Sequence, residues 1–180
     1  MHAPANTAAF VSGGAASPGF GFGAGRGFLI RPGRGNMVWV TDWGSEFDAP
    51  VDVVWAYLQS ETEHGPSHKG RRNFERKQVN ESTAMLAWEQ DIDGHWVRIA
   101  SHITFHPPIG FFVETIEGPM AGSKFFNYYV PKGDKTSVVV IGDWNSKVIP
   151  AAQLEAAVNA NLEKLYQEDS AGLKGFHKKK

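Results

Sequence analysis

The chain has 180 residues, a formal net charge of -1 and a pI of about 6.7, so its overall charge does not favour nucleic acid or an anionic membrane. It has no cysteine, which excludes disulfides, thiolate metal sites and a cysteine nucleophile. No apolar run approaches the roughly 20 residues that span a bilayer, and no signal-peptide pattern opens the chain. These features predict one cytoplasmic domain with no nucleic-acid partner and no stable membrane insertion.

Residues 1–36 are dominated by Gly, Ala, Pro and Ser and show no helical or strand periodicity, which predicts a disordered tail. The run GFGFGAGRG within this segment fits no register of G-x-G-x-x-G and follows no strand, so we do not expect it to hold a nucleotide. The Gly-Arg motifs GAGRG and PGRG supply only Arg26 and Arg34, which is too few for an RNA-binding tail. Regular patterning begins at Met37, and translation from Met1 or from Met37 is left open.

The run MVWVTDWGSEF, rich in Val, Trp and Thr, predicts a first strand from residue 37. A short helix is expected next, with Asp48 as its N-cap and Pro50 in its first turn, ending near Ser60. After the broken segment ETEHGPSHKG, six short runs rich in β-branched and aromatic residues alternate with turn signals such as Asp93-Gly94. Their spacing predicts an antiparallel meander.

The last element predicted is a long amphipathic helix that begins after Pro150. Its apolar stripe consists of Leu154, Val158, Leu162, Leu165 and Tyr166. The sheet must bury its apolar face against this stripe, so the fold class is α+β.

This order of elements, together with the stretch EFDAPVDVVWAYLQSETEHGPSHKG, resembles the START-like superfamily, also called SRPBCC, which includes polyketide cyclases, lipid-transfer domains and the birch-pollen allergen family. The most specific part is a strand that ends in an aromatic residue, followed by D-A-P and V-x-x-V-W-x-Y-L. The resemblance implies a helix-grip fold over residues 37–180. In that fold a curved seven-stranded antiparallel sheet wraps a long C-terminal helix, and one or two short helices follow the first strand. A small hydrophobic ligand between sheet and helix is then the expected partner.

The segment HGPSHKGRRNFER places His64 and His68 four residues apart, the spacing of two zinc ligands on one helical face. Gly65 and Pro66 lie between them and interrupt helical hydrogen bonding, and no third ligand is nearby in the sequence. We therefore expect no metal and no cofactor. The alternatives are solvated loop residues or, by the resemblance, ligand-contacting residues at the entrance to the cavity.

Four further residues are candidates for contact with a ligand. Alternation along HWVRIASHITF puts Ser101 on the apolar face of its strand. Glu114 and Asn127 each interrupt a strongly apolar strand, and either could be one of the few polar groups of an apolar pocket or could face solvent. One tyrosine of the pair at 128 and 129 must face inward, and Tyr129 is our candidate.

Three functions remain open at this point. A domain that binds or carries a small hydrophobic or aromatic molecule, such as a lipid or polyketide, is favoured. A cyclase, aromatase or dehydratase without a metal, using a polar residue of the cavity for proton transfer, is the second. The third is a protein-interaction domain in which the cavity has no role, and a homodimer is left open.

Overall fold

The computed structural model describes residues 37–60 and 62–177, and the predicted tail 1–36 lies outside them. The elements are β1 (Met37–Phe47), α1 (Val51–Leu58), α2 (His64–Ser67), β2 (Arg71–Gln78), β3 (Thr83–Ile92), β4 (His95–His106), β5 (Gly110–Glu117), β6 (Lys124–Lys132), β7 (Lys135–Asn145) and α3 (Ala151–His177). No helix among these residues is long and apolar enough to cross a membrane.

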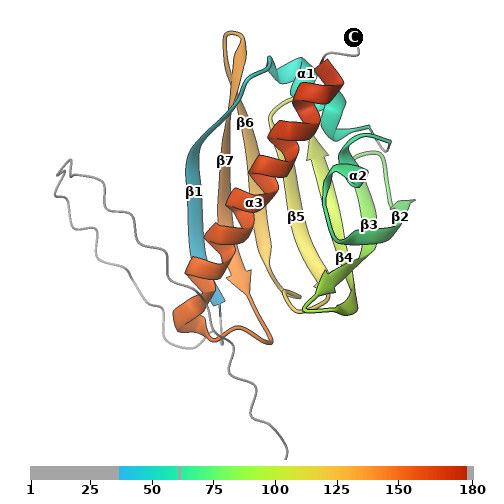
Figure 1. The fold of residues 1–180 in the computed structure, drawn as a ribbon, viewed down its shortest axis with the longest axis vertical. Coiled ribbons are helices and arrows are strands. Elements are labelled where there is room, and N and C mark those ends of the chain that lie inside the picture. Colours follow the sequence, from blue (N-terminus) through green and yellow to red (C-terminus); the bar gives the residue numbers. More distant parts are fainter. Residues whose placement is uncertain (1–36, 61, 178–180) are drawn as a thin grey trace, which may run out of the picture. The chain divides into compact units, whose positions relative to one another are not determined.

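The strands form one antiparallel sheet of seven in the order β1-β7-β6-β5-β4-β3-β2, and α3 runs across one of its faces (Figure 1). Strands β2 to β7 follow one another as hairpins, while α1 and α2 connect the two edge strands β1 and β2. Asp93 and Gly94 both have positive φ angles, 53° and 81°, as a tight two-residue hairpin between β3 and β4 requires. This is the α+β helix-grip arrangement that the resemblance implies.

Helix α3 packs on the β1 and β7 side of the sheet. Its side chains Leu154, Val158 and Leu162 are buried in one cluster with residues of these two strands, Val40, Val140 and Trp144. Phe125 stacks on Trp144 with ring centroids 4.1 Å apart and continues this core onto β6. Three of the predicted stripe residues are therefore core residues, and the apolar periodicity of the helix is explained by burial.

A second buried cluster joins the C-terminal part of α3 to α1 and to the adjoining ends of β1 and β6. It includes Phe47, Val54, Tyr57, Tyr129 and Leu173. The cluster holds α1 against α3 and contacts β5 through Phe111, whereas neither cluster includes a residue of β3 or β4.

The start of α1 differs from the prediction. Pro50 is the N-cap residue, and its carbonyl oxygen accepts hydrogen bonds from the backbone nitrogens of Val53 and Val54. Asp48 lies two residues earlier and is exposed, with its carboxylate 3.9 Å from the Lys135 ammonium. The proline side chain has no hydrogen-bond acceptor, so no side-chain cap forms there.

Candidate functional site

The side of the sheet that faces α3, here called the inner face, carries many aromatic side chains. Residues directly opposite each other in antiparallel strands share a face, and the pairs Val140 with Asn127, Asn127 with Phe111, and Phe111 with Phe105 extend the inner face from β7 to β4. The inner-face side chains that remain half-buried include Leu86, Trp88, Ile99, Ile103, Phe105, Phe111, Phe125 and Asn127. A partly exposed apolar surface thus lies on the strands that α3 does not cover.

Aromatic rings form a row across this surface. Ring centroids are 6.3 Å apart for Phe105 and Phe111, 6.0 Å for Phe111 and Tyr129, and 6.3 Å for Tyr129 and Trp55 of α1. These separations fall in the range in which aromatic pairs attract each other. The row offers ring faces and edges to any flat apolar molecule that lies against it.

A few polar groups interrupt the apolar surface. Ser101 is buried on the inner face, and its hydroxyl oxygen lies 3.4 Å from that of Thr115 on the neighbouring strand. Asn127 is half-buried between Val140 and Phe111. The indole nitrogen of Trp88 is buried and has no hydrogen-bond partner among the described residues. Binding sites for small molecules commonly combine a mostly apolar lining with a few polar groups.

Tyr129 reaches the inner face from β6 and is 6% exposed. Burial raises the pKa of its phenol well above the usual range, and the charge of Asp169 adds to this effect. Tyr129 therefore holds a neutral phenol within the electrostatic influence of the acidic residues on α3.

Glu114 lies on the opposite, outer face of the sheet. Its β5 neighbours Val113 and Thr115 are buried on the inner side, whereas the Glu114 carboxylate is 38% exposed and lies 2.7 Å from the Lys124 ammonium. The expectation that it could line a pocket is corrected by this register, because alternate residues of a strand point to opposite faces.

His64 and His68 come together in space, contrary to the reasoning from the Gly-Pro break. Residues His64–Ser67 form the single turn α2, and the Nε2 atoms of the two imidazoles are 3.3 Å apart. Asp169 of α3 joins them, with its Oδ1 atom 3.3 Å from His64 Nε2 and 3.5 Å from His68 Nε2. The third ligand-type side chain that the local sequence lacks is therefore supplied by the C-terminal helix.

Further hydrogen bonds hold this cluster together. Glu168 lies 3.1 Å from the Nδ1 atom of His68. The Tyr57 hydroxyl donates to Ser67 Oγ at 2.9 Å and lies 3.4 Å from Asp169 Oδ1, and Ser67 Oγ donates to the His64 carbonyl at 2.6 Å. Burial raises the pKa of Tyr57 to about 12, which keeps its phenol protonated at neutral pH.

Acidic groups outnumber basic ones around the cluster, where the carboxylates of Glu168 and Asp169 face the guanidinium of Arg71. Burial, with a contribution from Arg71, lowers the pKa of His68 to about 4, so its imidazole is neutral at pH 7. The Arg71 guanidinium lies over the Trp88 ring, 5.0 Å from its centroid, and its Nε donates a hydrogen bond to Gln90 Oε1. Burial lowers the pKa of Arg71, and the negative charges of Asp169 and Glu168 oppose this shift. Arg71 thus connects the cluster to the apolar inner face.

Sequence reasoning missed Asp169, Glu168, Arg71 and Trp88 as members of the site. A signal for Asp169 exists in the helix: it lies seven residues after Leu162 and four before Leu173, both buried, so it occupies a position of the apolar stripe. A carboxylate on the buried side of an amphipathic helix requires a partner. The partner could not be chosen from the sequence, because it lies about 100 residues away.

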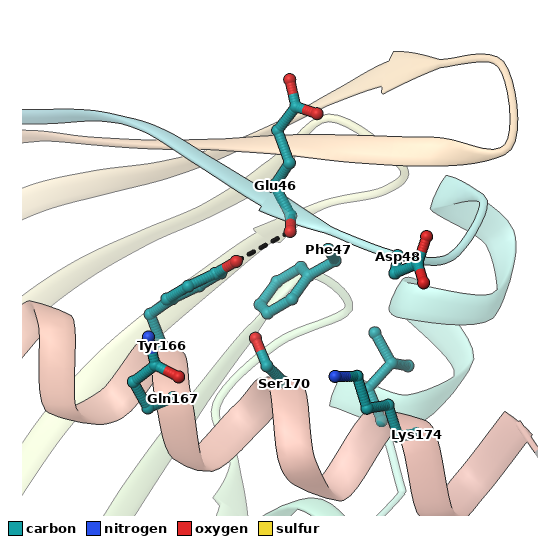
Figure 2. Close-up of a pocket in the computed structure, with 8 residues that line it drawn as sticks. Glu46, Phe47, Asp48, Tyr166, Gln167, Ser170 and Lys174 are labelled. Atoms are coloured by element: carbon teal, nitrogen blue, oxygen red, sulfur yellow. Dashed lines mark hydrogen bonds between the residues drawn. The ribbon is translucent and has the colours of Figure 1, made fainter.

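Two hollows of about 340 Å³ flank the C-terminal half of α3. One lies between the end of β1 and α3, where the Tyr166 hydroxyl donates to the Glu46 carbonyl at 2.8 Å beside Phe47 (Figure 2). Ser170 lines it, and its buried hydroxyl has no partner among the described residues. The other is lined by Ser67, Lys69 and α3 residues next to the histidine cluster. Neither includes side chains of β3 to β6.

No protein-family model and no curated protein matches this chain. Solved structures do. The Zhui aromatase/cyclase from Streptomyces sp. R1128 is similar with a TM-score of 0.61 at 14% identity, over 77% of this chain and 92% of that chain. A START superfamily protein from Mycobacterium smegmatis gives 0.63 at 16% identity, over 77% and 97%.

Norcoclaurine synthase from Thalictrum flavum, solved with dopamine and hydroxybenzaldehyde, gives a TM-score of 0.55 at 15% identity, over 81% of this chain and 95% of that chain. Identities this low establish the fold alone. The chain therefore has the START-like helix-grip fold, and its function must be argued from its own residues.

Proposed function

We propose that the protein binds a small apolar molecule with an aromatic or polycyclic part on the inner face of β3 to β6. The observation that carries the proposal is the row of aromatic rings from Phe105 on β4 to Trp55 on α1, in which Phe105, Phe111 and Trp55 are half-buried. The proposal rests on the partial exposure of these aromatic side chains and does not require an enclosed cavity. Covering them would remove apolar surface from water at about 25 cal/mol per Å².

Polar groups on the same face would orient the ligand. Trp88 offers a buried indole N–H without a partner, and Asn127 and Tyr129 offer an amide and a phenol. A ligand with one or two oxygen acceptors fits this set, because satisfying a buried donor recovers about 1–3 kcal/mol of desolvation cost. Among the solved structures with this fold, norcoclaurine synthase holds aromatic molecules, which agrees with the chemistry proposed.

The test is a titration with 8-anilinonaphthalene-1-sulfonate, whose fluorescence reports an apolar environment. We expect saturable binding to the wild type and at least about a tenfold loss, equivalent to about 1.4 kcal/mol, in Ser101→Trp, which fills the inner face. His102→Trp is the matched control, since the neighbouring side chain points to the outer face. Phe111→Ala, which removes one ring of the row, should also weaken binding.

Thermal unfolding of each variant separates loss of the site from loss of the fold, because overpacking alone can cost about 1–3 kcal/mol. Equal affinity in folded Ser101→Trp, Phe111→Ala and His102→Trp would overturn the proposal. It would favour the hypothesis that the domain acts through contacts with another protein.

A second candidate function is an enzyme of the cyclase or dehydratase type acting on such a ligand. It is favoured by Tyr129, whose phenol lies on the inner face where the ligand is proposed to bind. Burial and the negative charge of Asp169 raise the pKa of this phenol and keep it neutral. An enzyme of this kind would lose turnover in Tyr129→Phe while retaining affinity. A carrier would show no conversion of ligand in either form.

A further inference from the structure

We propose that His64, His68 and Asp169 bind a divalent transition-metal cation, with Zn²⁺ the best fit. The two Nε2 atoms and Asp169 Oδ1 form a triangle with sides of 3.3, 3.3 and 3.5 Å. Zinc bonds to nitrogen and oxygen of about 2.0–2.1 Å at tetrahedral angles place neighbouring ligand atoms about 3.3–3.4 Å apart. The triangle therefore has the size of one face of a zinc coordination tetrahedron.

The donor set agrees with this assignment. Two imidazoles and one carboxylate suit zinc and its transition-metal neighbours, whereas Mg²⁺ and Ca²⁺ prefer sites made of oxygen alone. Three protein ligands leave a fourth position for water or for a donor atom of a bound molecule. The His64 side chain is 27% exposed and those of His68 and Asp169 are 5% and 16% exposed, so a cation can enter beside His64 and be held by two fixed ligands.

Residues around the triangle support the role. Glu168 faces His68 Nδ1 at 3.1 Å, the carboxylate contact that commonly orients a metal-binding histidine and leaves its Nε2 lone pair free. Without a cation, the two Nε2 atoms and Asp169 Oδ1 would face one another within 3.5 Å. Two carboxylates against the one Arg71 guanidinium also leave the cluster with a net negative charge.

The sequence expectation of no metal rested on the Gly-Pro break and on the missing third ligand. The structure removes both premises, because α2 brings the rings together and α3 supplies Asp169. The inference does not depend on the proposed ligand at the inner face, since none of the three residues belongs to the aromatic row.

The experiment uses the full chain, stripped of metal with a chelator, and titrates it with Co²⁺ alone and then with Zn²⁺. We expect one equivalent of Co²⁺ to give the intense visible absorption of a four-coordinate site, and Zn²⁺ to abolish it. His64→Ala and Asp169→Asn should each lose at least about 100-fold in affinity. Glu168→Gln should retain the stoichiometry and lose about 10- to 100-fold.

Controls come from the outer face. His102→Gln and Glu114→Gln remove the same kinds of side chain far from the triangle and should bind like the wild type. Zn²⁺ should also raise the thermal midpoint of the wild type and the controls but not of Asp169→Asn. Absence of saturable metal binding by the wild type would overturn the proposal, as would unchanged binding in folded His64→Ala and Asp169→Asn.

Discussion

Among single residues, Gly172 of α3 is glycine because the Tyr57 side chain occupies the space that a Cβ atom would need, and not because of its own backbone conformation. A Cβ atom at this position would lie 2.2 Å from the Tyr57 hydroxyl oxygen and 3.2 Å from Ser67 Cβ. The missing side chain allows Tyr57 to approach α3 and to reach the Asp169 carboxylate. The helix accepts a poor helix former there because the cluster beside α2 needs the space.

We predict that Gly172→Ala destabilises the protein by about 1–3 kcal/mol through overpacking. Alanine would otherwise stabilise a helix interior by about 1 kcal/mol relative to glycine. Chemical denaturation measures the difference. Gly175→Ala in the same helix is the control, since nothing lies within 4 Å of its Cβ position. A Tyr57→Phe background should reduce the cost of Gly172→Ala, and an unchanged cost would show that the contact was misjudged.

Alternation within strands assigned a face to Ser101 but left Glu114 and Asn127 open between the pocket and solvent. Ser101 could be assigned to the inner face because its strand has one apolar side. Glu114 could not, because both faces of FFVETIEG are apolar and only the pairing with neighbouring strands fixes which one meets α3. Register across a sheet depends on contacts between strands, which a single segment does not contain.

At the scale of elements, the sequence predicted all seven strands, the short helix after β1 and the long C-terminal helix. These elements carry strong periodicity and clear turn residues. The sequence leaves the second short helix, α2, open as one of one or two short helices after β1, because Gly65 and Pro66 interrupt the helical pattern. The first residues of a helix have no intrahelical partner for their N–H groups, so a proline in a single turn costs no hydrogen bond.

We predict that Leu162→Ala lowers the free energy of unfolding by about 2–5 kcal/mol. Leu162 is 7% exposed and belongs to the cluster that joins α3 to β1 and β7, so the truncation leaves a cavity in the core. Urea denaturation gives the change. Asn161→Ala, an exposed position in the same turn, should shift the midpoint little. A shift near zero for Leu162→Ala would mean that this stripe does not hold the helix on the sheet.

At the scale of the whole molecule, the described residues contain a complete sheet and both cores. Helices α1 and α2 connect the two edge strands β1 and β2, and among the described residues the clusters on α3 draw on β1, β5, β6, β7 and α1. We therefore expect the chain from Met37 to bury its apolar surface without the first 36 residues.

We predict that a variant lacking residues 1–36 unfolds cooperatively, with a thermal midpoint close to that of the full chain. Differential scanning calorimetry of the two forms makes the comparison. The control is a variant that lacks residues 151–177, because removing this core helix should abolish the cooperative transition. A truncated chain without such a transition would show that the first 36 residues contribute to the core.

The central claim, that an aromatic molecule lies on the inner face, is tested most directly by the indole N–H resonance of Trp88. In ¹⁵N-labelled protein titrated with 8-anilinonaphthalene-1-sulfonate, this signal, assigned with Trp88→Phe, should shift with the same concentration dependence as the dye fluorescence. The signals of Trp39 and Trp96, which are 50% and 43% exposed on the outer face, should stay in place. Shifts at Trp39 or Trp96 with none at Trp88 would contradict the account.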